Sequence, residues 1–486
     1  MRGQMINFRP IARVIGILLC IVGLMMWTGL PFSGYYGEDL RPLLLAGLTT
    51  IGAGGLFLLI RNPRGIPIRK REGYLIVALS WLAMTTFGML PYLYSGILPG
   101  VPDALFETVS GMTTTGASVI TDIEAQPRGL LYWRSLTQWI GGMGIIVLTV
   151  AVFPLLGIGG IELFAAEAPG PTSDKLHPRI SETAKRLWFI YVGLTFLLGV
   201  LLWLFGLSPY EAINHALTTM ATGGFSTRNA SAAAFSPSVQ YLIVVFMFLA
   251  GVNYTVLYLS LKRRWTEVWR SDELKAYIGL VVVLTAIITA KVYLGAEVDN
   301  FEQAFRDGLF QVVSLITTTG FVSADYSQWA TSAQLMIFVL LFLGACAGST
   351  SGGIKLIRHL VFFKNSYLEF KRILHPSAII PLRINGEVVP GKIITHVFNF
   401  LLLYLLLFVF GSVALAMMGL DFMTAIGAMA TSLGNVGPGV GDVGPTDNFA
   451  WLPAHVKLFL TFIMLVGRLE IFTVLVLFTP YFWRLN

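Results

Sequence analysis

The chain has 486 residues, of which 55% are hydrophobic and only 12% are charged, with a formal net charge of +7. Soluble globular proteins carry about 25% charged residues, and a soluble chain of this length would need several polar domain surfaces. The composition therefore excludes a soluble enzyme, a disordered chain and, with two cysteines, a disulfide scaffold. It indicates an all-α polytopic membrane protein, in which lipid replaces water as the outer solvent.

Ten apolar runs are long enough to cross a bilayer, since a spanning helix needs about 20 residues. They lie near 12–30, 42–60, 73–96, 132–157, 187–206, 238–261, 276–295, 333–363, 393–419 and 455–482. The first run follows three arginines but ends without a small-x-small cleavage site. We therefore interpret it as a retained helix and not as a signal peptide.

Four shorter apolar stretches are typical of re-entrant half-helices, because they are too short to span. They lie near 103–114, 210–221, 305–318 and 421–432. Each ends in a segment of small residues that contains a glycine. These four segments are Thr113, Thr114, Thr115, Gly116; Met220, Ala221, Thr222, Gly223; Thr317, Thr318, Thr319, Gly320; and Thr431, Ser432, Leu433, Gly434, with Asn435 after the last.

The recurrence predicts an internal repeat of about 100 residues, because each segment has a long apolar run before and after it. We expect two leading helices followed by four units of helix, half-helix, loop and helix around a pseudo-fourfold axis. The expected divisions are 1–70 for the leading helices, then 71–170, 171–265, 266–375 and 376–486 for the four pore repeats.

Charge asymmetry predicts the orientation. Of the 33 Lys and Arg residues, 25 lie on one side of the ten runs, whereas 15 of the 26 acids lie on the other side. The positive-inside rule makes the basic side cytoplasmic, which places both termini there and lets the four loops enter from outside. Acids on the outer side are expected to concentrate cations; they include Asp122, Glu124, Asp299, Asp325, Asp442 and Asp447.

Four loops around one axis can direct backbone carbonyls toward a dehydrated monovalent cation. Each half-helix would also direct the negative end of its dipole toward the pore. The alternative is that the small residues only mediate helix packing. Four such loops in the same context favour a cation selectivity filter.

A gate is predicted in the eighth run, where ten small residues follow one another and make a poor helix. They are Gly344, Ala345, Cys346, Ala347, Gly348, Ser349, Thr350, Ser351, Gly352 and Gly353. A break at membrane depth is tolerated where it lines a cavity. The alternative is a packing face of small residues.

Arg468 is expected deep in the last apolar helix, where a charge needs a partner or water. Glu470 lies two positions later, on another helical face. Arg468 is predicted either to pair with another helix or to lie beside the conduction path, as a barrier to cations or a tether for the 344–353 segment.

The four loops, the two leading helices, the small-residue segment and this arginine together resemble the TrkH/KtrB/HKT superfamily of potassium transporters, most closely its bacterial TrkH family. The resemblance covers nearly the whole chain and implies four non-identical pore units in one subunit, with K⁺ bound mainly by loop carbonyls. In this superfamily a glycine in the first loop goes with potassium and a serine with sodium, so Gly116 indicates potassium. The family also places a gating loop at 344–353 and an arginine at 468.

The resemblance implies gated, potential-driven potassium uptake across the bacterial inner membrane, a homodimer, and a cytosolic TrkA-like ring with nucleotide-binding domains. The chain has no ATPase motif, so nucleotide control would come from that partner. The basic segments 262–264 and 355–392 are candidates for contacting it, or ordinary positive-inside charge. Potassium is the expected permeant ion, and neither an organic cofactor, a catalytic site nor a nucleic-acid partner is expected.

Two alternative functions would each need residues of another kind. A symporter coupled to protons or sodium would need buried carboxylates or histidines, and the membrane segments offer few besides Glu107, His215 and Glu470. A lipid-modifying enzyme would need a cluster of such groups, and none is apparent. Segment 386–393 resembles a P-loop but lacks the final Ser/Thr, and Asn385-Gly386 predicts a hairpin there instead.

Overall fold

The computed structural model describes residues 6–60, 70–147, 176–295, 298 and 300–484. In this part of the chain nearly all regular structure is helical, as expected. Two helices precede the repeats, α1 (Phe8–Trp27) and α3 (Arg41–Leu58), with the short α2 (Leu30–Tyr35) between them. They pack through glycines, because a Cβ on Gly16 would lie 2.8 Å from the Gly54 carbonyl oxygen. Such close backbone approach is how membrane helices associate.

Each repeat begins with a long helix that packs against a shorter one, the pore helix. The long helices are α4 (Lys70–Gly88), α10 (Leu176–Leu204), α15 (Asp272–Leu294) and α19 (Gly391–Met417). The pore helices are α6 (Val101–Met112), α11 (Pro209–Met220), α16 (Phe301–Ile316) and α20 (Phe422–Gly434). The four predicted half-helices are therefore confirmed as helices. Their starts are set by capping: Ser208 forms a capping box with Glu211, and Asp421 accepts from two N–H groups of α20.

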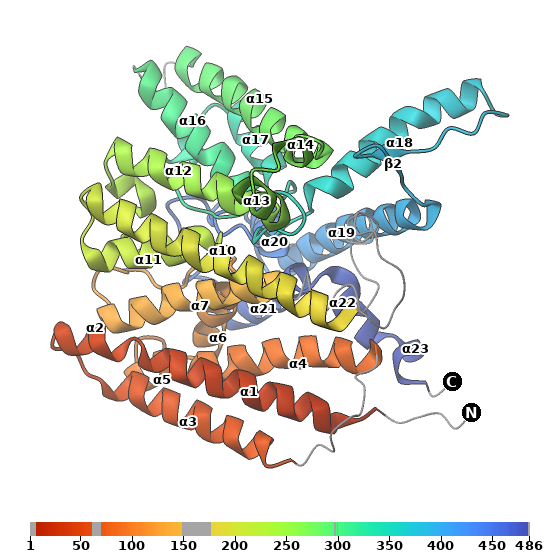
Figure 1. The fold of residues 1–486 in the computed structure, drawn as a ribbon. Coiled ribbons are helices and arrows are strands. Elements are labelled where there is room, and N and C mark those ends of the chain that lie inside the picture. The colour runs from red at the N-terminus through yellow and green to blue at the C-terminus, as the bar shows by residue number, and fades with distance from the viewer. Residues whose placement is uncertain (1–5, 61–69, 148–175, 296–297, 299, 485–486) are drawn as a thin grey trace.

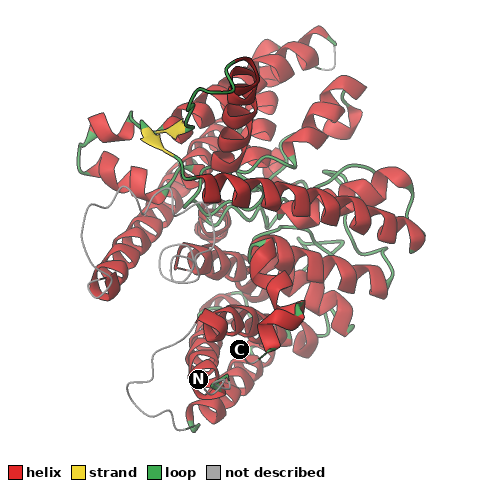
Figure 2. Ribbon diagram, turned by 90° about the vertical axis from the view of Figure 1, so that its right-hand side faces the viewer, coloured by secondary structure: helices red, strands yellow, loops and turns green. Residues whose placement is uncertain are grey.

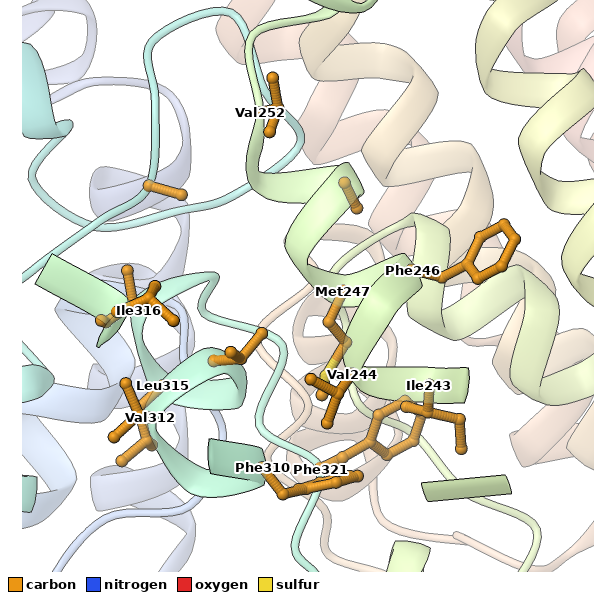
Figure 3. Close-up of a cluster of buried hydrophobic side chains, with 14 of the residues drawn as sticks. Ile243, Val244, Phe246, Met247, Val252, Phe310, Val312, Leu315, Ile316 and Phe321 are labelled. Atoms are coloured by element: carbon orange, nitrogen blue, oxygen red, sulfur yellow. The ribbon is translucent and has the colours of Figure 1, made fainter. Parts of the chain in front are cut away.

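In the first, second and fourth repeats the second helix packs against the pore helix of the following repeat. Helix α7 (Arg128–Val147) contacts α11, α12 (Pro237–Gly251) contacts α16, and α21 (Ala454–Arg468) returns to contact α6. Figure 3 shows one such contact, where Val244 and Met247 of α12 meet Phe310 of α16. The last repeat thus closes onto the first, and the chain forms a ring.

Three second helices are interrupted. The angle between α12 and α13 (Tyr254–Leu261) is 104°, and that between α21 and α22 (Ile471–Leu475) is 114°. In the third repeat α17 (Thr331–Leu340) and α18 (Leu356–Leu374) are separated by 15 non-helical residues, 341–355. The predicted break in the eighth run is confirmed, but the expectation of unbroken sixth and tenth helices was wrong.

Among the described residues, six helices are long and apolar enough to span a membrane, or up to eight if each bent pair counts as one span. The chain is therefore a multi-pass membrane protein. Its lipid-compatible surface includes side chains such as Phe196 and Phe410, which are 73% and 68% exposed. The remaining predicted spans fall on the broken α17–α18 pair and on 132–157, part of which lies outside the described residues.

The remaining elements lie between or after these helices. They are α5 (Leu90–Ser95), α14 (Trp265–Val268), α23 (Pro480–Trp483), the 3₁₀ turns Ser231–Ala234, Tyr326–Gln328 and Val476–Phe478, and the strands β1 (Arg383–Ile384) and β2 (Glu387–Val388). The start of α1, α23 and α18 lie at one end of the molecule, at the right of Figure 1. Figure 2 views this end and shows the antiparallel strands in yellow. The predicted hairpin at Asn385-Gly386 is confirmed.

Candidate cation pathway

All four pore helices end in the same backbone motif. A residue with positive φ follows each helix: Thr114 (54°), Thr222 (53°), Thr318 (55°) and Asn435 (54°). The next N–H bonds back to the helix carbonyl five residues earlier, for example Thr115 N to Ser110 O at 2.8 Å and Val436 N to Thr431 O at 3.0 Å. This is a Schellman-type ending, which turns the chain sharply at the C-terminal end of the helix.

A glycine with positive φ follows two residues later in every loop: Gly116 (86°), Gly224 (78°), Gly320 (79°) and Gly437 (104°). By backbone conformation these glycines, and not Gly223 and Gly434, occupy equivalent positions, so the structural alignment of the second and fourth loops differs by one and three residues from the one expected from the sequence. The predicted Thr431, Ser432, Leu433 and Gly434 lie in the last turn of α20, and Met220 is the last residue of α11. In the second loop two glycines follow Thr222, and the second of them is the equivalent one; in the fourth loop Asn435 takes the left-handed position occupied by threonine elsewhere.

The four loops form a closed ring through these glycines. A Cβ on Gly116 would overlap the Gly223 carbonyl oxygen, one on Gly224 the Thr319 oxygen, and one on Gly320 the Val436 oxygen. A Cβ on Gly437 would lie 2.7 Å from the Thr115 oxygen and so return to the first loop. The same contact therefore recurs four times, each between one loop and the next. Only glycine allows both this φ and this approach.

Polar side chains behind the ring hold the loops in place. The Gln138 Nε2 donates to Gly223 O at 2.6 Å, and its Oε1 accepts from Phe225 N at 3.1 Å. Asn435 Nδ2 donates to Thr115 Oγ1 at 3.0 Å and so joins the fourth loop to the first. Our sequence interpretation missed Gln138, because a single polar residue in an apolar helix gives no indication of what it contacts.

A buried ion pair supports the first loop. The Arg134 Nε donates to Glu107 Oε1 at 2.6 Å, and both side chains are almost fully buried. Glu107 also accepts from the Ser118 hydroxyl and from Val119 N at 2.8 Å. Its second-repeat equivalent, His215, bonds Ser226 Oγ at 3.0 Å and Glu211 O at 2.8 Å, which confirms it as a hydrogen-bonded core residue.

The 344–353 segment lies directly beneath the ring. Thr350 Oγ1 donates to Met220 O at 3.1 Å, and Gly352 N donates to Thr318 Oγ1 at 2.6 Å. A Cβ on Gly352 would lie 2.7 Å from Gly434 O. Ser349, Thr350 and Ser351 are at most 1% exposed. The segment therefore contacts the ends of three pore helices or their loops.

Arg468 contacts this segment from the fourth repeat. Its Nη1 donates to Thr350 O at 2.9 Å and its Nη2 to Gly141 O at 3.4 Å. It is 3% exposed, and no carboxylate of the described residues lies within salt-bridge distance of it. Arg468 ends α21 and does not lie within a continuous helix, which corrects its expected position.

Glu470 faces another arginine. Its Oε2 accepts from Arg358 Nη2 at 2.6 Å, and the Arg358 guanidinium also stacks 3.7 Å from the Phe400 ring centre. Glu470 itself has a φ of 65° at the sharp bend after α21. Arg468 and Glu470 therefore have different partners, because the backbone bend directs their side chains apart.

A cavity opens on the other side of the ring. Its lining includes the four ring glycines, Ser118, Arg134 and Asp447. At its rim, hydrogen bonds from the Asn229 amide and from Ala125 N hold the pKa of Asp122 below its ordinary value, so this acid stays ionised. Glu124 pairs with Arg228 at 3.5 Å, whereas the expected outer acid Asp299 lies outside the described residues.

Comparison with known proteins matches residues 43–484 to the family model TrkH, described as "Cation transport protein". The chain belongs to the TrkH family. The Trk system potassium uptake protein TrkH of Salmonella typhimurium is 38% identical to it over 484 residues, covering 98% of this chain and all of the relative. The Escherichia coli relative TrkG is 34% identical over 487 residues, covering 98% and 99%.

Among TrkH-family structures, the crystal structure of the potassium transporter TrkH from Vibrio parahaemolyticus superposes with a TM-score of 0.91. Sequence identity is 35%, and the match covers 99% of this chain and all of the other. The TrkH-family fold therefore extends over the whole chain, as the resemblance implied. Within the described residues no group of three or more His, Cys, Asp or Glu side chains forms a metal site.

Proposed function

We propose that this protein is a potassium-selective, gated uptake pore, driven by the membrane potential across a bacterial inner membrane. The observation that carries the proposal is the fourfold ring, in which each loop's glycine meets a carbonyl of the next loop. Such a ring has four sets of backbone carbonyls at one depth, which suits a dehydrated monovalent cation. The relatives named potassium uptake proteins support potassium as that ion.

The pore helices add to the attraction for cations. Each helix ends at its loop, so four negative dipole ends converge on the ring. The carbonyls proposed to hold K⁺ follow the structural register and belong to Thr113–Gly116, Ala221–Gly224, Thr317–Gly320 and Gly434–Gly437. We expect the remaining predicted filter residues, Met220 and Thr431–Leu433, to act as supports at the ends of their pore helices.

The 344–353 segment and Arg468 are proposed as the gate. The segment contacts the loops on the side opposite the outer cavity, and Arg468 tethers it through Thr350. A buried guanidinium beside a cation path also raises an electrostatic barrier. Conduction would then require Thr350 and its neighbours to leave the axis.

The positive-inside distribution supports a cytoplasmic location for both termini and for the end that carries α18 and the hairpin. Potassium entering an inside-negative cell gains about 2.3 kcal/mol per 100 mV. A homodimer and a cytosolic, nucleotide-binding TrkA-like ring remain part of the proposal. The exposed side chains Trp265 and Trp269, 54% and 56% exposed beside the basic segment 262–264, offer a contact surface for such a ring.

Cation flux into proteoliposomes under a clamped potential tests the function. Potassium current should reverse at the potassium equilibrium potential whatever the pH or sodium gradient. A reversal that follows the proton or sodium gradient would instead establish a symporter. Absence of any potassium flux, with the purified chain intact and with 345–352 deleted, would refute both.

A further inference from the structure

The first turn of α15 carries a carboxylate that the proposed pore does not use. Glu273 is 1% exposed. Its Oε1 accepts hydrogen bonds from Ala347 N at 2.8 Å and from Ile357 N at 3.1 Å. Ala347 belongs to the 344–353 segment and Ile357 to the first turn of α18. One oxygen atom of α15 therefore joins the two ends of the segment.

The two ends also contact each other. Gly344 N donates to Ile354 O at 2.8 Å, and Leu356 N donates to Ala345 O at 3.1 Å. The segment is thus a loop with a narrow neck, and Glu273 lies at that neck. Thr350, held by Arg468, forms the opposite tip. Arg468 attaches the loop to the fourth repeat and Glu273 attaches it to α15, in addition to its hydrogen bonds with Met220 and Thr318.

Glu273 fits an anchoring role better than an ion-pairing role. No basic side chain of the described residues lies within salt-bridge distance of it, and its observed partners are the two backbone N–H groups. A buried carboxylate is costly unless it is hydrogen-bonded. The carboxylate and the two ends of the loop therefore stabilise each other.

The neighbouring residue extends this attachment to the cytoplasmic end. Asp272 Oδ2 accepts from Lys364 Nζ of α18 at 2.7 Å, and Asp272 N donates to Asn385 Oδ1 of the hairpin at 2.7 Å. One helical turn thus contacts α18, the hairpin and the loop. A displacement of α18 would pull directly on the neck.

We propose that Glu273 is a positioning residue that keeps the 344–353 segment in the conduction path by anchoring both ends of the segment to α15. The inference rests on the proposed function only in taking the conduction path as the place that the segment blocks. The anchoring itself concerns the position of the loop and is measurable without any ion flux.

Cys346, adjacent to Ala347 and 1% exposed, reports the position of the loop. The chain has one other cysteine, Cys20, so Cys20→Ser leaves a single thiol. The experiment measures the rate at which a water-soluble thiol reagent modifies Cys346 in the full-length protein in detergent, where both faces are accessible. Glu273→Ala removes the acceptor, Glu273→Gln keeps a neutral one, and Thr285→Ala, about 18 Å further along α15, serves as control.

Glu273→Ala should raise the modification rate by about tenfold or more, because two buried N–H groups lose their acceptor. Glu273→Gln should raise it less, since an amide oxygen still accepts, and Thr285→Ala should leave it unchanged. An unchanged rate in Glu273→Ala, or an equal rise in Thr285→Ala, would overturn the proposal. An equal rise in Glu273→Gln and Glu273→Ala would also overturn it, since a hydrogen-bond acceptor at position 273 would then not affect the position of the loop.

If Glu273→Ala does not yield folded protein, Glu273→Asp replaces it. The shorter side chain reaches at most one of the two N–H groups, so the rate should still rise, and an unchanged rate refutes the anchor. Potassium flux is measured on the same variants. Faster labelling with unchanged flux would retain the anchor and refute the assignment of the segment as the gate.

Discussion

The guanidinium of Arg468 donates to the backbone carbonyl of Thr350 across 2.9 Å, although the two residues are 118 positions apart in the chain. The contact joins the bend of the fourth repeat to the tip of the 344–353 loop. Because the acceptor is a main-chain oxygen, no substitution at position 350 removes it, and the contact is best tested from the arginine.

Arg468→Ala should raise basal potassium flux by about tenfold, because it removes both the tether and a positive charge beside the path. Arg468→Gln keeps a neutral donor and removes only the charge, so flux in this variant separates the two effects. The measurement is potassium flux into proteoliposomes at a fixed potential. Flux at the wild-type level in Arg468→Ala would show that the contact restrains nothing.

Deleting residues 345–352 should give a folded protein with high, unregulated flux. The geometry favours rejoining, because Gly344 N already bonds Ile354 O at 2.8 Å and a Cβ on Gly353 would lie 3.4 Å from Gly344 Cα. Circular dichroism and size-exclusion chromatography establish folding before flux is measured. A folded deletion variant that conducts no faster than the intact protein would contradict the gate assignment.

The structural register of the ring predicts unequal effects of glycine substitutions. Gly224→Ala should strongly impair potassium selectivity, because the new Cβ would overlap the Thr319 carbonyl oxygen of the next loop. Gly434→Ala should affect selectivity less, because its Cβ would face Leu341 O, outside the ring, at 2.8 Å. Relative potassium and sodium permeability measures both. A larger loss in Gly434→Ala than in Gly224→Ala would favour the register expected from the sequence.

Gly116→Ser should lower potassium over sodium selectivity. Its φ of 86° disfavours any side chain, and a Cβ would overlap Gly223 O, so the contact between the first and second loops must widen. Gly386→Ser is a matched control, since Gly386 also has a φ of 86° but has open space around it in the hairpin. Selectivity should change only in the first variant. Unchanged selectivity in Gly116→Ser would remove Gly116 from the filter.

The Glu107–Arg134 pair should stabilise the first loop in a non-additive way. Either Glu107→Gln or Arg134→Met leaves one buried group without its partner and should lower the free energy of unfolding by about 3–5 kcal/mol. The double variant should lose much less than the sum of the two. Thermal unfolding in detergent measures each. Strict additivity would mean that the two groups do not depend on each other.

The helices and their repeated order were predictable because membrane helices consist of long apolar runs. The glycine-rich break at 344–353 was also predictable, since ten small residues leave little helical preference. The sharp bends at Asn253 and Glu470 were not, because each lies in a run that is apolar on both sides, and isolated polar residues in such a run do not indicate a bend. A bend of this kind depends on what packs beneath it, and hydropathy contains no such information.

The register of the four loops could not be derived from the amino-acid sequence alone. A threonine-rich segment followed by glycine is a good signal in the first and third loops, where it matches the structure. In the fourth loop Asn435 takes the left-handed position, and the ring glycine comes two residues later. The Thr350 partner of Arg468, the Arg358 partner of Glu470 and the Ala347 partner of Glu273 likewise lie 118, 112 and 74 residues away, so only the folded chain identifies them.

The ring of four loops belongs to one polypeptide, so its four seams, the contacts between neighbouring loops, are chemically distinct. In an assembly of identical subunits one codon change alters every seam at once. Here a single substitution alters one seam and leaves three intact, as with Gly116 against Gly437. The consequence is that each loop can diverge in sequence without the same change in the other three. The fourth loop, with asparagine in place of threonine, has already done so.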